Sequence, residues 1–211
     1  MNLDEPKPGT APASALVPAA DEHRLMVLMF TDLVDSSGLK AQLGDVAYAQ
    51  KIAKPHNKIF RDILARFAGA QTLNYTGDGF LASFRSVGDA VDAALLFHHA
   101  LRIYPWDSRS VATRVGIHVG EAVMIEGNDP DKMLIASHAA DMCARLMNLG
   151  AGGQTLLTRH AFDDARQYVR AHPPVSDSTE APQLEWAAHG RYRFKGHDSS
   201  GPRSIEGASK Q

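Results

Sequence analysis

The sequence predicts a mixed α/β domain built on a largely antiparallel sheet that is flanked by helices. Apolar segments typical of strands alternate along the chain with segments of helical periodicity. Some of the strand segments are joined directly by tight turns, which only antiparallel strands allow. The chain has 211 residues, 44% of them hydrophobic and 22% charged, which is the composition of one globular domain with a full core.

Composition also argues against several classes of partner. The formal net charge is −2, so no basic excess favours nucleic acid as a partner. Apolar runs stay far below the ~20 residues that span a bilayer, and no signal-peptide pattern is present, so no membrane partner is expected. The one cysteine, Cys143, excludes an intrachain disulfide and fits a reducing, cytoplasmic location.

The strands are expected in a regular order. Residues 1–22 are rich in Pro and Ala and are predicted to be a disordered tail, residues 23–207 the domain, and residues 208–211 a C-terminal tail. The continuous apolar run at 25–30 predicts a central strand that is covered on both faces. Further strands are expected at 71–84 as a hairpin, 112–125 as two strands with a bend at Gly120, and 154–158, 184–195 and 203–207.

Helices are predicted between these strands. Ser36 or Ser37 is expected to cap the helix after the first strand. The longer helices are predicted at 45–67, 87–103, 135–149 and 159–168. Pro55 lies inside the first of them and predicts a kink or a break into two helices. Gly150 is expected to end the third.

Two carboxylates stand in similar surroundings, each next to a predicted strand end. Asp78 is the tip of the turn Gly77-Asp78-Gly79, in which the glycines allow a sharp reversal. Asp32 follows the apolar first strand. An isolated aspartate of this kind is usually a solvated turn residue or a helix cap, but carboxylates at adjacent strand ends form a site for hard divalent cations.

Three blocks of sequence, in this order, resemble the class III nucleotide cyclase catalytic domain over about residues 23 to 207. The first is Phe-Thr-Asp-Leu-Val-Asp-Ser-Ser at 30–37, and the second is Tyr-Thr-Gly-Asp-Gly-Phe at 75–80. The third combines residues 114–120 with 144–146 and 152–157. The resemblance implies that a nucleoside triphosphate is the substrate: its 3′-hydroxyl attacks the α-phosphorus and pyrophosphate leaves, with two divalent cations, Mn²⁺ or Mg²⁺.

The resemblance also implies roles for individual residues. Asp32, Asp78 and the carbonyl of Leu33 would hold the metals. Ser36, Ser37, Arg114 and Lys195 would bind the triphosphate, although Arg114 is as readily an ordinary rim arginine. Arg145 would stabilise charge on the α-phosphate. Each site would be composite in a head-to-tail homodimer, with Asp32, Asp78 and Arg114 from one subunit and Asn74, Arg145 and Lys195 from the other.

The sequence departs from purine cyclases at the base-reading positions. Asn74 stands where they carry lysine or glutamate, Leu134 stands at the second position, and Tyr75 is a further candidate for base contact. Asp141 replaces an asparagine of the transition-state site. This pattern resembles the stand-alone bacterial pyrimidine cyclases of Pycsar antiphage systems, which implies UTP or CTP as substrate, cUMP or cCMP as second messenger, and a separate effector.

Two alternatives remain open at this point. One is an adenylate cyclase with atypical base contacts, in which Asn74 does the work of lysine. The other is a cyclase-like dimerisation or binding module without turnover, for which Asp141 is the main support. Retention of the two metal aspartates, Arg145 and Lys195 argues against an inactive module.

Overall fold

The sheet is built around β1 (Glu22–Leu33), which lies between β3 (Gly79–Phe84) and β4 (Thr113–Glu126). The computed structural model describes residues 22–107, 109–126, 133–135, 137–174, 184–192 and 203–209. Residues 1–21 of the predicted tail and Lys195 lie outside them, whereas Glu22 is the first residue of β1. Within the described residues the strand order is β2-β3-β1-β4-β6-β8-β7, with β5 paired to β4. Every pairing is antiparallel except that of β4 with β6, so the predicted fold class is confirmed.

The other strands complete the sheet on both sides of β1. They are β2 (Gln71–Tyr75), β5 (Met133–Ile135), β6 (Thr155–Thr158), β7 (Glu185–Tyr192) and β8 (Arg203–Ser209). The helical segments are α1 (Ser36–Leu43), α2 (Asp45–Tyr48), the π-helical turn η1 (Ala49–Ala53), α3 (Lys54–Leu64), α4 (Val87–Ile103), α5 (His138–Leu149) and α6 (Arg159–Tyr168).

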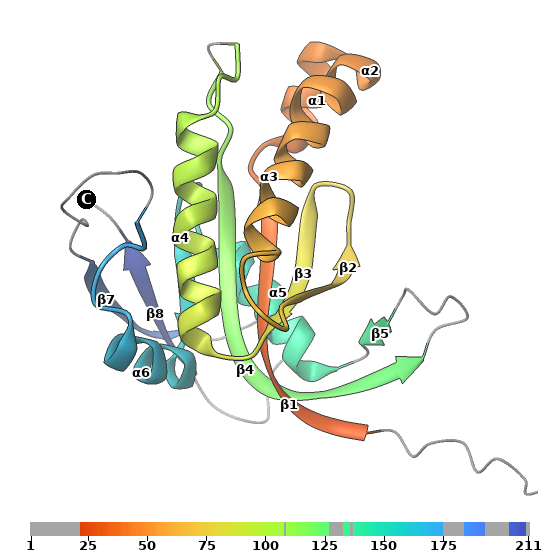
Figure 1. Cartoon of the computed structure of the whole chain (residues 1–211). Coiled ribbons are helices and arrows are strands. Elements are labelled where there is room, and N and C mark those ends of the chain that lie inside the picture. The colour runs from red at the N-terminus through yellow and green to blue at the C-terminus, as the bar shows by residue number, and fades with distance from the viewer. Residues whose placement is uncertain are drawn as a thin grey trace, which may run out of the picture.

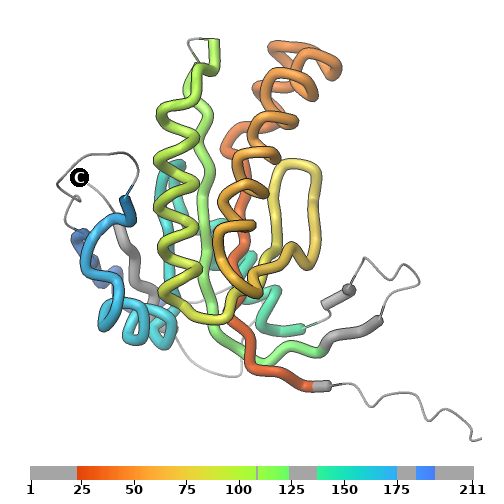
Figure 2. The backbone as a smooth tube through the Cα atoms, viewed as in Figure 1, coloured from red at the N-terminus to blue at the C-terminus, as the bar shows by residue number. Residues whose placement is uncertain are grey.

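Helices cover both faces of β1. Val27 and Met29 belong to the large core that α3, α4 and α6 complete, whereas Leu28 packs with Ala139 and Cys143 of α5. Because successive strand residues point to opposite faces, these two cores lie on opposite sides of the sheet. Figures 1 and 2 show α3 and α4 side by side over one face and α5 behind the strands. The predicted central strand is confirmed.

Three of the predicted boundaries are wrong. β4 is one strand rather than the predicted two, because its ladder with β1 is continuous from Glu22–Met124 to Leu33–Thr113, although it curves strongly along its length (Figure 1). α5 begins at His138 rather than Ile135, because the Ser137 side chain caps it by accepting from Ala140 N. Neither predicted serine caps α1. Its N-cap is Asp35, which has a left-handed φ of 54°.

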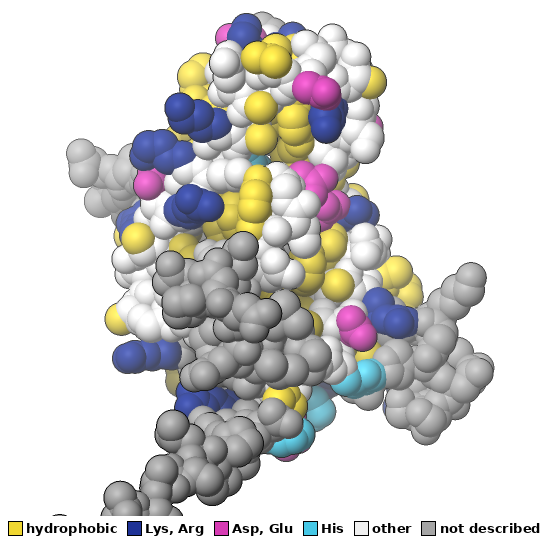
Figure 3. Space-filling model, turned by 90° about the vertical axis from the view of Figure 1, so that its right-hand side faces the viewer, with side chains coloured by type: hydrophobic (Ala, Val, Ile, Leu, Met, Phe, Trp, Pro, Cys, Tyr) yellow, Lys and Arg dark blue, Asp and Glu magenta, His cyan; other side chains and the backbone are white. Residues whose placement is uncertain are grey.

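The predicted break near Pro55 takes a specific form. The chain stays helical from Asp45 to Leu64, but it widens into η1 just before the proline. Pro55 then falls in the first turn of α3, where a missing N–H costs little. No helix among the described residues has the length and apolarity needed to cross a membrane. On the side that carries the β2–β3 hairpin, basic and acidic side chains are interspersed (Figure 3).

His98 on α4 is expected to make the free energy of unfolding depend on pH. Its Nε2 lies 3.0 Å from Thr155 Oγ1, and burial lowers its pKa to about 4. The unfolded chain, with an ordinary pKa of 6.5, then binds a proton that the folded chain does not. Stability therefore falls as pH drops from 6.5 to 4, by about 3 kcal/mol at the low end. Urea unfolding of His98→Gln should show a shallower decline, whereas the exposed His23→Gln should match the wild type.

Candidate active site

The end of β1 and the β2–β3 turn meet at one end of the sheet. Asp32 pairs with Gly79, and Leu33 N donates to the carbonyl of Asp78 at 3.1 Å. A Cβ on Gly79 would lie 2.1 Å from the Thr31 carbonyl oxygen, so only glycine permits this approach. The predicted pair of carboxylate-bearing segments is therefore brought together by backbone pairing.

Asp32 is held by Arg114. In the β1–β4 ladder the two residues are direct partners, and their side chains share one face. Arg114 donates from Nε at 2.9 Å and from Nη2 at 2.6 Å, and both bonds reach the same oxygen, Oδ2 of Asp32. Each side chain is only about a quarter exposed, at 22% and 29%. A partly desolvated, two-bond pair of this kind fixes the positions of both groups.

Asp78 has a different environment. Ser36 Oγ donates to Asp78 Oδ2 at 2.5 Å, which joins the start of α1 to the turn. Beside this contact is a hollow of about 290 Å³, lined by Ser36, Ser37, Lys40, Tyr48, Thr76, Gly77 and Asp78. Burial and, to a smaller extent, the charge of Asp78 raise the pKa of Tyr48. Its hydroxyl therefore stays protonated and can donate a hydrogen bond.

Sequence reasoning missed Lys40 and Tyr48 in this hollow. Lys40 stands four residues after Ser36, so the helical spacing places both on one face of α1. That spacing was readable from the sequence. The position of Tyr48 could not be predicted from the sequence, because its distance from Asp78 depends on how α2 packs against the turn.

The donor set fits a hard divalent cation. Two carboxylates and a backbone carbonyl are oxygen ligands of the kind that Mg²⁺ and Mn²⁺ prefer. In the ranges that the structure describes, this site included, no group of three or more His, Cys, Asp or Glu side chains is placed to hold a metal. With so few protein ligands, the remaining positions would fall to water and phosphate oxygens, as is usual for Mg²⁺.

The residues assigned to base contact and catalysis lie elsewhere. Asn74 pairs with Leu81, which belongs to the core on the α5 face, and Tyr75 pairs with Phe80 on the opposite face. Arg145 is half-buried and Asp141 exposed, both on α5. Leu134 lies in β5, and its backbone pairs with Ile125. The roles predicted for these residues therefore stay predictions.

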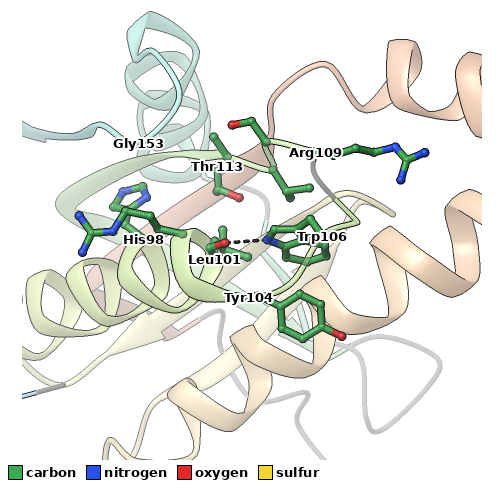
Figure 4. A pocket seen from close by; sticks show the side chains of 11 residues that line it. His98, Leu101, Tyr104, Trp106, Arg109, Thr113 and Gly153 are labelled. Atoms are coloured by element: carbon green, nitrogen blue, oxygen red, sulfur yellow. Dashed lines mark hydrogen bonds between the residues drawn. The ribbon is translucent and has the colours of Figure 1, made fainter. Parts of the chain in front are cut away.

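A second hollow, of about 350 Å³, lies where α4 leads into β4 (Figure 4). Its wall includes Leu101 and the buried Trp106, whose Nε1 donates to the Leu101 carbonyl at 2.6 Å. Although it is larger, this hollow is lined by no carboxylate. Of these two hollows, the smaller one is therefore the one that carries a predicted metal carboxylate, Asp78.

Solved structures with similar folds are nucleotide cyclases. Adenylate cyclases from Trypanosoma brucei, solved in their monomeric state, match with a TM-score of 0.72 at 18% identity over 87% of each chain. The adenylyl cyclase CyaB from P. aeruginosa matches with a TM-score of 0.73 at 14% identity, over 90% of this chain and 96% of that one. This is the fold of the class III cyclase catalytic domain.

Two further comparisons give another structure with this fold and one curated relative. An adenylate/guanylate cyclase/hydrolase from Silicibacter pomeroyi shares it with a TM-score of 0.67 at 22% identity, over 90% of this chain and 98% of that one. Among curated proteins, the uncharacterized protein Rv1359 of Mycobacterium tuberculosis is 34% identical over 104 residues, which cover 49% of this chain and only 37% of that protein. No family model matches the chain. The TM-scores establish the cyclase fold.

Proposed function

We propose that the chain is a nucleotide cyclase that converts a nucleoside triphosphate to a 3′,5′-cyclic nucleotide and pyrophosphate. The observation that carries this proposal is the meeting of Asp32 and Asp78 at one end of the sheet, through the Leu33–Asp78 backbone bond. Two bound cations, Mn²⁺ or Mg²⁺, would activate the 3′-hydroxyl and neutralise the leaving pyrophosphate.

The protein groups around Asp78 suit a triphosphate. Ser36 and Ser37 lie in the first turn of α1, where backbone N–H groups are unpaired within the helix, and Lys40 adds a positive charge one turn later. Arg114 lies at the same end of the sheet, where it donates to Asp32. Lys195 is proposed as a further phosphate ligand by resemblance alone.

We propose that two copies of the chain form a head-to-tail homodimer with two composite sites. Asn74 and α5, which carries Arg145 and Asp141, share the sheet face toward which Asp32 and Arg114 point. A partner that packs on this face would bring its own Asn74 and Arg145 to the carboxylates. Arg145 would then stabilise charge on the α-phosphate.

Mixing two inactive variants tests the composite site. Asp32→Ala and Arg145→Ala should each be inactive alone, whereas an equal mixture should regain about a quarter of wild-type activity, because half the dimers carry one intact site. A mixture of Asp32→Ala with Asp78→Asn is the matched control and should stay inactive, since both defects fall in the same half-site. Equal recovery in both mixtures would reject the composite site.

For the substrate we propose UTP, with CTP second, as in the pyrimidine cyclases of antiphage defence, with a separate effector that senses the product in the cytoplasm. Asn74 and Leu134 are the proposed base-contacting residues, whereas Tyr75, the further candidate, lies on the opposite face of the sheet from Asn74. The support is the absence of the purine-reading lysine or glutamate at Asn74. An amide both donates and accepts, so it can read a pyrimidine edge.

Incubation with each of the four triphosphates and Mn²⁺, with the products identified by mass, tests both activity and base. Dominant cUMP or cCMP is expected. Dominant cAMP would instead support an adenylate cyclase, the activity named for several structures of this fold. A folded protein that makes no cyclic product from any triphosphate would reject the proposed activity, and it would favour a binding module.

A further inference from the structure

A chain of side-chain hydrogen bonds runs from the start of β4, through α3, to the turn that carries Asp78. Thr113 Oγ1 lies 3.1 Å from His56 Nε2, and His56 Nδ1 lies 3.1 Å from Asn57 Oδ1. Asn57 Nδ2 donates to the Tyr75 hydroxyl at 2.6 Å, and that hydroxyl donates to the carbonyl of Gly77. The chain thus ends one residue before Asp78.

From Gly77 back to His56, the donors and acceptors allow only one direction. The Gly77 carbonyl only accepts, so the Tyr75 hydroxyl donates to it and accepts from the Asn57 amide. Asn57 Oδ1 must then accept from His56 Nδ1–H. Burial lowers the pKa of His56 and so favours the neutral imidazole. In that form Nε2 accepts from the Thr113 hydroxyl.

Packing fixes the inner half of this chain of hydrogen bonds, whereas Tyr75 at its outer end is 41% exposed. His56 is fully buried, and its ring lies 6.2 Å from Phe80 and 5.3 Å from Phe97, measured between ring centroids. Tyr75 lies 5.0 Å from the same Phe80 ring. The first bond of the chain is made by Thr113, whose neighbour Arg114 holds Asp32. One buried imidazole therefore links the strand beside Asp32 to the turn that carries Asp78.

We propose that Tyr75 is a positioning residue: its hydroxyl, braced by Asn57 and His56, fixes the turn so that the Asp78 carboxylate is held ready for a divalent cation. This inference rests on the proposed metal site. It differs from a base contact, because the hydroxyl is committed to Gly77 and Asn57 and the ring to Phe80. The ligand whose binding depends on these hydrogen bonds is therefore the divalent cation.

Binding of Mn²⁺ alone, followed by electron paramagnetic resonance, tests the role of Tyr75 without nucleotide. Tyr75→Phe keeps the ring but removes both hydrogen bonds, and it should weaken Mn²⁺ binding by about 10-fold, the lower end for the loss of a group that orients a ligand. Asn57→Ala should weaken binding in the same direction. Tyr168→Phe, at an exposed tyrosine of α6, is the matched control and should leave binding unchanged.

Activity gives the second measurement. For Tyr75→Phe, the Mn²⁺ concentration that gives half-maximal rate should rise with the dissociation constant, while kcat at saturating Mn²⁺ should recover to near the wild-type value. Unchanged Mn²⁺ binding, with only a raised KM for the triphosphate, would overturn the positioning role in favour of a base contact. A wild type that binds Mn²⁺ but forms no cyclic product would reject the proposed function and leave the positioning result intact. A wild type whose Mn²⁺ binding equals that of Asp78→Asn would reject both.

Discussion

Replacing Asp78 with asparagine is expected to lower the rate of cyclic-nucleotide formation by at least about 100-fold. The change removes the negative charge that would hold a cation but keeps an oxygen that can accept from Ser36 Oγ. The backbone bond from Leu33 N to the Asp78 carbonyl is also kept, so the turn should retain its place. Product formation with Mn²⁺ and a thermal unfolding scan measure the two effects separately.

The matched control for this experiment is Asp62→Asn. Asp62 is exposed on α3 and pairs with Lys58 at 2.5 Å, far along the helix from the turn. An exposed pair of this kind contributes little to stability, and the control should keep full activity. Metal-dependent turnover by Asp78→Asn at the wild-type rate would show that the cation is held elsewhere.

Gly116→Ala is expected to destabilise the fold by about 2 to 3 kcal/mol, the upper part of the range for overpacking a core. A Cβ on this β4 residue would lie 2.6 Å from Met147 N and 2.7 Å from the Cys143 carbonyl oxygen. Both are backbone atoms of α5, which cannot give way without the whole helix moving. Chemical unfolding, followed by circular dichroism, measures the loss.

Gly88→Ala provides the contrast for this substitution. Gly88 lies in α4, and the nearest atoms to an added Cβ are 3.7 Å away, which is ordinary contact. There the same change should stabilise the helix, by up to about 1 kcal/mol. Equal stability losses at both positions would show that the close approach of α5 to β4 does not decide the effect.

Sequence patterns predicted the elements that local signals define. The continuous apolar run of β1, the Gly77-Asp78-Gly79 turn and the helix over residues 87–103 all carry their own signals, and the structure has each of them. The predicted division of residues 112–125 into two strands at Gly120 is wrong, because a glycine signal is local whereas pairing with all of β1 is not. Tertiary pairing overrode the local preference.

The contacts within the site were harder to predict. The Asp32–Arg114 pair joins residues 82 positions apart and exists only because of the β1–β4 register. The Ser36–Asp78 bond likewise depends on how α1 meets the turn, and Ser36 was expected to cap the helix. The sequence indicated which residue types belong to the site. The register between strands, which decides which of these residues are in contact, could not be predicted from it. The roles of Asn74, Leu134, Asp141, Arg145 and Lys195 stay predictions.

Cys143, the one cysteine of the sequence, can report how stably α5 packs against β1 and β4. Cys143 Sγ lies 3.2 Å from the Gly116 carbonyl and 3.4 Å from that of Leu28, and burial raises the pKa of the thiol to about 12. An alkylating reagent needs an accessible thiolate, so it will react only while the helix is lifted from the strands. The rate of labelling in native buffer therefore measures how often α5 separates from the strands. Cys143 is the one cysteine in the sequence, so all of the label reports on this helix.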